Sequence, residues 1–131
     1  MSSLLRSAFR RLLAPCFFLA LCGGFIVALL PAPDGIDLAD GRDKIMHFVV
    51  FAGFAVLGLA AWPRSAKRII VALFVYGLAI ELAQAFVPYR SGDLLDWCAN
   101  AIGVLTVAVP WMLWQRLNVR SCAALRPNPK P

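Results

Sequence analysis

The sequence predicts an all-α membrane protein, a bundle of four transmembrane helices. Three observations lead to this fold class: the composition, four long apolar segments, and the uneven distribution of charge between the loops. Of the 131 residues, 61% are hydrophobic and only 15% are charged, and the mean hydropathy is +0.76. Soluble domains carry about 25% charged residues. This chain therefore has too little polar surface for a water-soluble globule, whereas a bundle facing lipid does not need it.

Each apolar segment is long enough to cross the membrane as a helix. A spanning helix needs about 20 residues at a rise of about 1.5 Å per residue. The four segments that meet this requirement are residues 12–31, 45–62, 69–88 and 97–114. The first carries no charge, the second holds one histidine, His47, and the third holds one carboxylate, Glu81. The fourth holds Asn100 near its start.

The first segment also permits another interpretation, a secretory signal peptide, because arginines precede the apolar run. The run is about 20 residues long, whereas the apolar region of a signal peptide has 7–15. No Ala-x-Ala site follows it, and the bulky Leu21 before Cys22 fits poorly with a lipoprotein cleavage site. We therefore expect a retained helix.

The loops differ in charge in a way that predicts orientation. Ten of the 13 Lys and Arg residues lie before residue 12, in the loop 63–68 and after residue 115, whereas six of the seven acids lie in the other two loops. Positive loops stay in the cytoplasm, so we expect both termini there. The predicted organisation is a cytoplasmic segment 1–11, a transmembrane domain 12–115 and a cytoplasmic, disordered tail 116–131. The net charge of +6 does not indicate nucleic-acid binding, because the cations sit at the segment ends.

Polar residues at membrane level fall at one depth, toward the outer face. They form three groups in which each residue lies three or four positions from another member and so shares a helix face with it: Asp43, Lys44 and His47; Glu81 and Gln84; and Asp93, Asp96 and Asn100. Gly103 extends the third face and would allow close helix approach. Ionisable side chains in a membrane usually face the protein interior. We therefore predict one polar pocket that opens to the extracytoplasmic side.

In their order and spacing, these residues resemble the VanZ-like family, named for a teicoplanin-resistance protein. The resemblance covers residues 43–103. The matching pattern reads Asp43-Lys44-x-x-His47-Phe48, then Glu81-x-x-Gln84, then Pro88-x-Arg90-x-x-Asp93-x-x-Asp96-x-x-x-Asn100-x-x-Gly103. The resemblance implies a multi-pass protein of the bacterial cytoplasmic (inner) membrane, with family members linked to glycopeptide tolerance, an antibiotic resistance. It implies no settled biochemical activity.

Three residues are candidates for catalysis: Glu81, His47 and Asp96. Glu81 is either an acid/base group or a buried carboxylate that is salt-bridged to Arg90 or Lys44. His47 is either an interfacial hydrogen-bonding residue or a proton-transfer group, since histidine titrates near neutral pH. Asp93 and Asp96 either cap the start of the fourth helix or belong to the site, and Asp96 is the stronger site candidate of the two because it shares a face with Asn100.

Six further residues are candidates for ligand binding: Lys44, Asp43, Gln84, Arg90, Asp93 and Asn100. Arg90 and Lys44 either pair internally with the acids or hold an anionic headgroup such as a phosphate. Gln84 and Asn100 have the alternative role of interhelical hydrogen bonding. A metal site built from the histidine and the acids lacks paired-histidine spacing, so we predict no metal ion and no cofactor.

Two functions agree with this pattern. The first is a binding or envelope-modifying protein whose outer pocket engages a membrane lipid, a lipid-linked cell-wall precursor or an amphiphilic antibiotic. The alternative is a membrane-embedded hydrolase or transferase that uses Glu81 or His47 as acid/base on a lipid-linked phosphate substrate. An ion channel fits less well, because the polar residues do not continue to the inner face.

Overall fold

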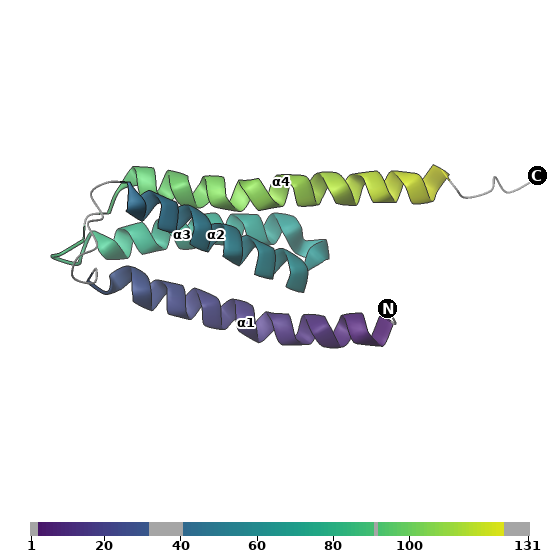
Figure 1. Cartoon of the computed structure of the whole chain (residues 1–131), viewed down its shortest axis with the longest axis horizontal. Coiled ribbons are helices and arrows are strands. Elements are labelled where there is room, and N and C mark those ends of the chain that lie inside the picture. The colour runs from purple at the N-terminus through teal and green to yellow at the C-terminus, as the bar shows by residue number, and fades with distance from the viewer. Residues whose placement is uncertain (1–2, 32–40, 91, 125–131) are drawn as a thin grey trace, which may run out of the picture.

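Four α-helices lie side by side in the structure, a computed structural model that describes residues 3–31, 41–90 and 92–124 (Figure 1). The helices are α1 (Ser3–Leu29), α2 (Arg42–Ala61), α3 (Ala66–Gln84) and α4 (Leu94–Ala124), and the 3₁₀ turn η1 (Pro63–Ser65) joins α2 to α3. Helices α2 and α4 run in one direction, and α1 and α3 run in the other (Figure 1). The described residues contain no strand, which confirms the all-α fold class.

Three helices, not the four predicted, are long and apolar enough to cross a membrane: Ala8–Leu29, Arg42–Ala61 and Leu94–Asn118. Helix α3 is not among them, so the predicted fourth span is not confirmed. The apolar segment 69–88 continues past the end of α3, which stops at Gln84 after 19 residues. Every stretch of 18 residues within α3 therefore contains three charged residues, Lys67, Arg68 and Glu81, and these keep α3 from counting as a candidate span.

The start and end of α2 follow from its neighbouring residues. Gly41 precedes the helix with φ +75°, a conformation that glycine adopts without a steric penalty. The helix ends before Trp62, which precedes Pro63 and has left the helical conformation, because proline disfavours a helical residue before it. Helix α2 thus begins three residues earlier than the predicted segment 45–62, and Asp43 lies in its first turn.

Helix α4 is the longest element, with 31 residues, and extends past α2 and α3 at one end of the bundle (Figure 1). It begins at Leu94, three residues before the predicted segment, and continues to Ala124. The predicted domain boundaries at residues 11 and 115 stay predictions, because α1 continues through residue 11 and α4 continues through residue 115. Residues 125–131 of the predicted tail lie outside the described residues.

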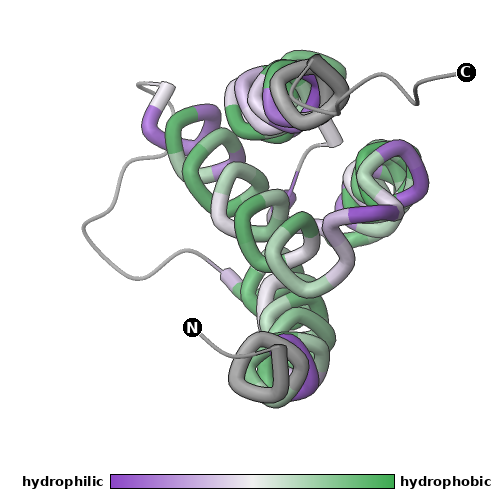
Figure 2. The backbone as a smooth tube through the Cα atoms, turned by 90° about the vertical axis from the view of Figure 1, so that its right-hand side faces the viewer, coloured by the Kyte–Doolittle hydropathy of each residue, from purple (hydrophilic) through white to green (hydrophobic). Residues whose placement is uncertain are grey.

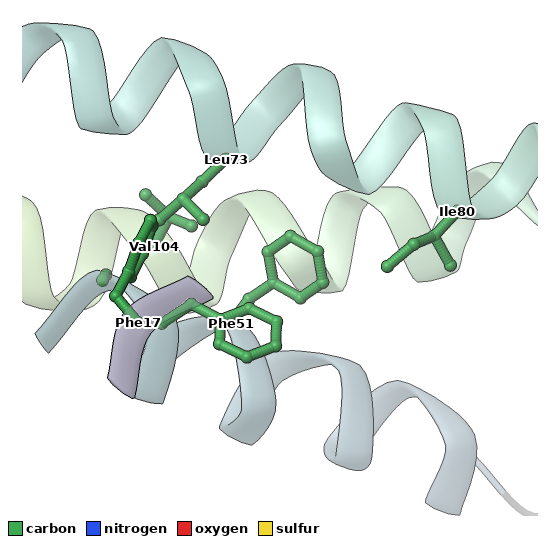
Figure 3. Packing of buried hydrophobic residues seen from close by; sticks show 7 residues of the cluster. Phe17, Phe51, Leu73, Ile80 and Val104 are labelled. Atoms are coloured by element: carbon green, nitrogen blue, oxygen red, sulfur yellow. The ribbon is translucent and has the colours of Figure 1, made fainter. Parts of the chain in front are cut away.

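The core of the bundle is small and receives side chains from every helix. Its buried members are Phe17 from α1, Phe51, Phe54 and Ala55 from α2, Leu73 and Ile80 from α3, and Val104 from α4. Figure 3 shows these side chains in the space between the helices.

Many large apolar side chains are exposed instead, such as Leu19, Val75 and Leu117, and Figure 2 shows hydrophobic residues along all four helices. An outer surface of this kind is typical of a protein in lipid.

Helices α2 and α4 approach each other closely at one glycine. A Cβ atom at Gly103 would overlap the backbone carbonyl oxygen of Phe48. Only glycine allows this approach, which confirms the prediction that Gly103 permits close helix packing. The contact lies one turn beyond Asn100 on α4 and one residue beyond His47 on α2, so it sets the distance between the polar faces of the two helices.

Candidate functional site

The first turns of α2 and α4 and the last turn of α3 meet at one end of the bundle (Figure 1). Seven predicted site residues contact one another there, and we name them the polar cluster: Asp43, Lys44, His47, Glu81, Asp93, Asp96 and Asn100. Their contacts confirm that polar side chains from three separate segments gather at one depth of the bundle.

Lys44 joins α2 to the start of α4. Its Nζ donates to Asp93 Oδ2 and to Asp96 Oδ1, each at 3.0 Å. The two acids differ in accessibility, because the side chain of Asp93 is 39% exposed and that of Asp96 only 5%. Lys44 was predicted either to pair with the acids or to hold an anionic headgroup, and in the structure it pairs with these two acids.

Asp93 connects three elements. Its Oδ1 accepts the backbone N–H of Leu95 at 2.9 Å, which caps the start of α4. Its own backbone N–H donates to Glu81 Oε2 at 3.2 Å. The Leu95 N–H and, after it, the Lys44 ammonium lower the pKa of the Asp93 carboxyl below the ordinary aspartate value. Asp93 is therefore a charged cap with a partner on each neighbouring helix.

Glu81 is the buried carboxylate of the cluster, with 7% of its surface exposed. Besides the Asp93 N–H, it accepts from Asn100 Nδ2, which lies 3.5 Å from Oε1. Its predicted partners for a structural salt bridge were Arg90 and Lys44, but neither pairs with it. Its ionisable partner is instead His47, whose Nδ1 lies 3.6 Å from Oε1.

Asn100 determines the tautomer of His47. The Asn100 amide directs its NH₂ toward Glu81 and its Oδ1 toward His47. That oxygen only accepts, so His47 Nδ1 carries a proton and donates to it at 3.0 Å. The other ring nitrogen, Nε2, faces Asp43 Oδ1 at 3.7 Å. A second proton at Nε2 would place the imidazolium between two carboxylates.

The polar cluster and the adjacent Arg90 contain more acids than permanent cations. They include four carboxylates and two permanent cations, Lys44 and Arg90, and the guanidinium of Arg90 lies 4.0 Å from Asp43 Oδ1. Asp43, His47 and Asp96 each offer a ligand atom, and these atoms lie within 4.8 Å of one another. Oxygen and imidazole ligands suit several divalent ions. A cation bound there would compete with Lys44 for Asp96.

Gln84 and Arg90 direct their hydrogen bonds toward α1. Gln84 Nε2 donates to the carbonyl of Ala28 at 3.0 Å, and two nitrogens of Arg90 donate to the carbonyl of Leu30 at 2.8 and 3.2 Å. The last carbonyls of a helix lack partners within it. Gln84 thus serves the interhelical role rather than joining the polar cluster, and Arg90 lies at its edge.

Some residues around the site escaped the sequence analysis. Tyr89 Oη donates to the carbonyl of Leu29, and Trp97 Nε1 donates to the carbonyl of Phe74. Gly77 lies against Asn100, where a Cβ would come within 3.2 Å of Nδ2. No sequence signal reveals these roles, because each partner is a backbone group or a side chain far along the chain.

Comparison with known proteins gives one finding. The family model described as VanZ/LLP1 matches residues 2–115, which include every residue of the polar cluster and all the predicted site residues. The chain belongs to the VanZ/LLP1 family. No curated protein and no solved structure matches it. Family membership and the apolar helices together make it a membrane protein of the VanZ family.

In this VanZ-family protein the polar cluster has a rim and an interior. Lys44, Asp93 and Asp43 form the rim, with side chains that are 39%, 39% and 26% exposed. His47 and Glu81 lie inside, with side chains that are 9% and 8% exposed. The rim can exchange its internal ion pairs for those of a charged ligand, and the interior can hold or transfer a proton.

Proposed function

We propose that this VanZ-family protein lies in the bacterial cytoplasmic membrane and binds the headgroup of an envelope lipid or of a lipid-linked cell-wall precursor. The polar cluster is the binding site, and it faces the outside of the cell. The observation that carries the proposal is the partly exposed rim of charged side chains, Lys44, Asp93 and Asp43, on a bundle that exposes many large apolar side chains.

The charge of the loops supports this orientation. The cation-rich turn that contains Arg64, Lys67 and Arg68 lies at the end of α3 opposite Glu81. Positive loops stay in the cytoplasm, so the polar cluster would face outward and both termini inward. This topology requires α3 to cross as well. Burial of Glu81 against the other helices supports that crossing, because α3 then presents a largely apolar surface to lipid.

The balance of charges indicates the ligand class. A zwitterionic headgroup carries a phosphate and an ammonium, and both have partners at the rim. The phosphate would pair with Lys44 and Arg90, and the ammonium would pair with Asp93 and Asp43. Four carboxylates against two permanent cations favour a ligand that brings an amine. The amine of an amphiphilic glycopeptide antibiotic satisfies the same requirement, which connects the site to glycopeptide tolerance.

Native mass spectrometry of the protein in detergent, titrated with phosphatidylethanolamine, phosphatidylglycerol and undecaprenyl diphosphate, tests the proposal. We expect Lys44→Gln and Asp93→Asn to weaken binding about tenfold each, because each removes one charge-assisted hydrogen bond. Arg42→Gln is the matched control, since Arg42 is an exposed cation in the same turn of α2 with no ion pair among the described residues. Equal binding by Lys44→Gln and Arg42→Gln would contradict the proposal.

Topology has its own experiment. In a cysteine-free background, a membrane-impermeant maleimide added to whole cells should label Ala39→Cys and leave Ser65→Cys unlabelled. Labelling of position 65 from outside would reverse the orientation and place the polar cluster in the cytoplasm.

A second function, catalysis by the interior of the cluster, is favoured by the placement of His47 between Asp43 and Glu81. An imidazole in contact with a buried carboxylate can accept and return a proton during hydrolysis or transfer of a lipid-linked phosphate. Glu81→Gln separates the two functions. Under the catalytic hypothesis this variant binds lipid and loses all turnover, whereas under the binding hypothesis it retains most of the protein's effect on glycopeptide tolerance.

A further inference from the structure

A cationic hollow lies at the end of the bundle opposite the polar cluster. It has a volume of about 670 Å³, and its walls are the turn η1, the first turn of α3 and one face of α4. Four of its nine lining residues are cations and none is an acid. The four cations are Arg64, Lys67, Arg68 and Arg116.

These cations have no acidic partner in the part of the chain that the structure describes. All the ion pairs found there belong to the polar cluster and Arg90. The acid nearest to Lys67 along α3 is Glu81, 14 residues away, which corresponds to about 21 Å of helix. Screening in physiological salt acts over about 8 Å. The mutual repulsion of the four cations is therefore not relieved from within these residues.

The backbone around the hollow is held in place. Gln115 Nε2 on α4 donates to the carbonyl of Pro63 at 3.0 Å, which ties η1 to α4. Ala66 is buried and belongs to a small core cluster with Leu59 and Ala108. No side chain caps α3 at Ser65, so the first backbone N–H groups of that helix add positive potential.

Orientation in the membrane explains why cations lie at helix ends, but it does not require them to converge. Arg68 and Arg116 are 48 residues apart in sequence and line one cavity. The geometry points to a phosphate-binding site in this hollow, occupied by the headgroup of an anionic lipid or by a soluble phosphate compound. Guanidinium groups suit the shared chemistry, because their planar donors bind two phosphate oxygens at once. The site is separate from the polar cluster and does not depend on the function proposed for it.

The test uses the full chain in phosphatidylcholine nanodiscs and two probes, inorganic phosphate and added phosphatidylglycerol. The melting temperature and the bound lipid, counted by native mass spectrometry, are the readouts. We expect the double variant Arg68→Gln/Arg116→Gln to bind at least about tenfold more weakly than the wild type, since charge-assisted hydrogen bonds to phosphate are lost. Arg10→Gln/Arg11→Gln is the matched control, because it removes two exposed cations of α1 that do not line the hollow.

The outcomes separate the ligand sources. Stabilisation by phosphatidylglycerol alone identifies a lipid headgroup, and stabilisation by millimolar phosphate identifies a soluble compound. Equal weakening by both double variants, or no stabilisation of the wild type by either probe, overturns the site. A further variant, Gln115→Leu, keeps all four cations but removes the tie to Pro63. It should also weaken binding, and unchanged affinity would show that charge density alone attracts the anion and that no defined hollow is needed.

Discussion

Replacing Asn100 with leucine tests whether the hydrogen bonds of the polar cluster stabilise the bundle. Asn100 is 2% exposed, accepts from His47 Nδ1 at 3.0 Å and donates to Glu81 Oε1 at 3.5 Å. Leucine branches at the same carbon but neither donates nor accepts. His47 and Glu81 would each lose a partner in a place that water barely reaches.

The size of the effect follows from the contacts that remain. A buried group left without its partner costs about 1–3 kcal/mol, so two groups set an upper limit of about 6 kcal/mol. Glu81 keeps the Asp93 N–H at 3.2 Å, however, and hydrogen bonds between membrane helices average only about 0.6 kcal/mol. We expect the free energy of unfolding to fall by about 2 kcal/mol, or about 30-fold in the unfolding equilibrium constant.

Unfolding by sodium dodecyl sulfate in mixed micelles, followed by circular dichroism, measures this difference. Asn118→Leu is the matched control, because Asn118 is an exposed asparagine on the same helix. If Asn100→Leu were as stable as the wild type, or more stable, our reasoning would be refuted. Replacement of a buried polar network by apolar side chains does stabilise some proteins, so the experiment can distinguish the two cases.

Three other predictions concern packing, pH and metal. Gly103→Ala should lower the melting temperature and ligand binding, because its Cβ meets the Phe48 carbonyl, whereas Gly53→Ala, where a Cβ meets nothing within 4 Å, should not. Because Asp93 has a lowered pKa, its contribution to stability is complete above the ordinary aspartate pKa of about 3.9 and is lost as the pH falls through its lower folded value. Melting temperatures from pH 6 to pH 2 should therefore drop less in Asp93→Asn. Because Lys44 already occupies Asp96, a chelator should leave the melting temperature unchanged, and a fall would indicate that a metal ion is bound.

The helices and the gathering of polar groups could be predicted because both follow from periodicity. Asp43 and His47 are four residues apart, as are Asp96 and Asn100, and this spacing places each pair on one helix face. A charged face in an apolar segment has to turn toward other polar groups. The sequence therefore predicts that Lys44 pairs with an acid, but it does not predict that this acid is Asp96.

Other features depend on contacts that no side-chain pattern encodes. The end of α3 at Gln84 separates the helix from the last apolar residues of its segment, which changed the number of candidate spans. Arg90 donates to the Leu30 carbonyl because the end of α1 lies beside it. Every residue has a backbone carbonyl, so the residue type at position 30 does not predict this contact. The hydrogen-bonded state of His47 likewise depends on the orientation of the Asn100 amide.

The two ends of the bundle are charged in opposite senses, and this separation has consequences for both proposed sites. At one end, four carboxylates outnumber the two permanent cations beside them. At the other end, four cations line the hollow and none of them pairs with an acid among the described residues. A charge asymmetry of this kind orients a membrane protein during insertion. Orientation alone, however, needs only exposed charges near the helix ends. Burial of Glu81 and Asn100 at one end, and the tie from Gln115 to Pro63 at the other, fix these charges in defined geometry. Fixed geometry at a membrane surface is what recognition of a headgroup requires. The same division of charge therefore supports both proposals, an amine-bearing ligand at the end with the polar cluster and a phosphate at the end with the cationic hollow.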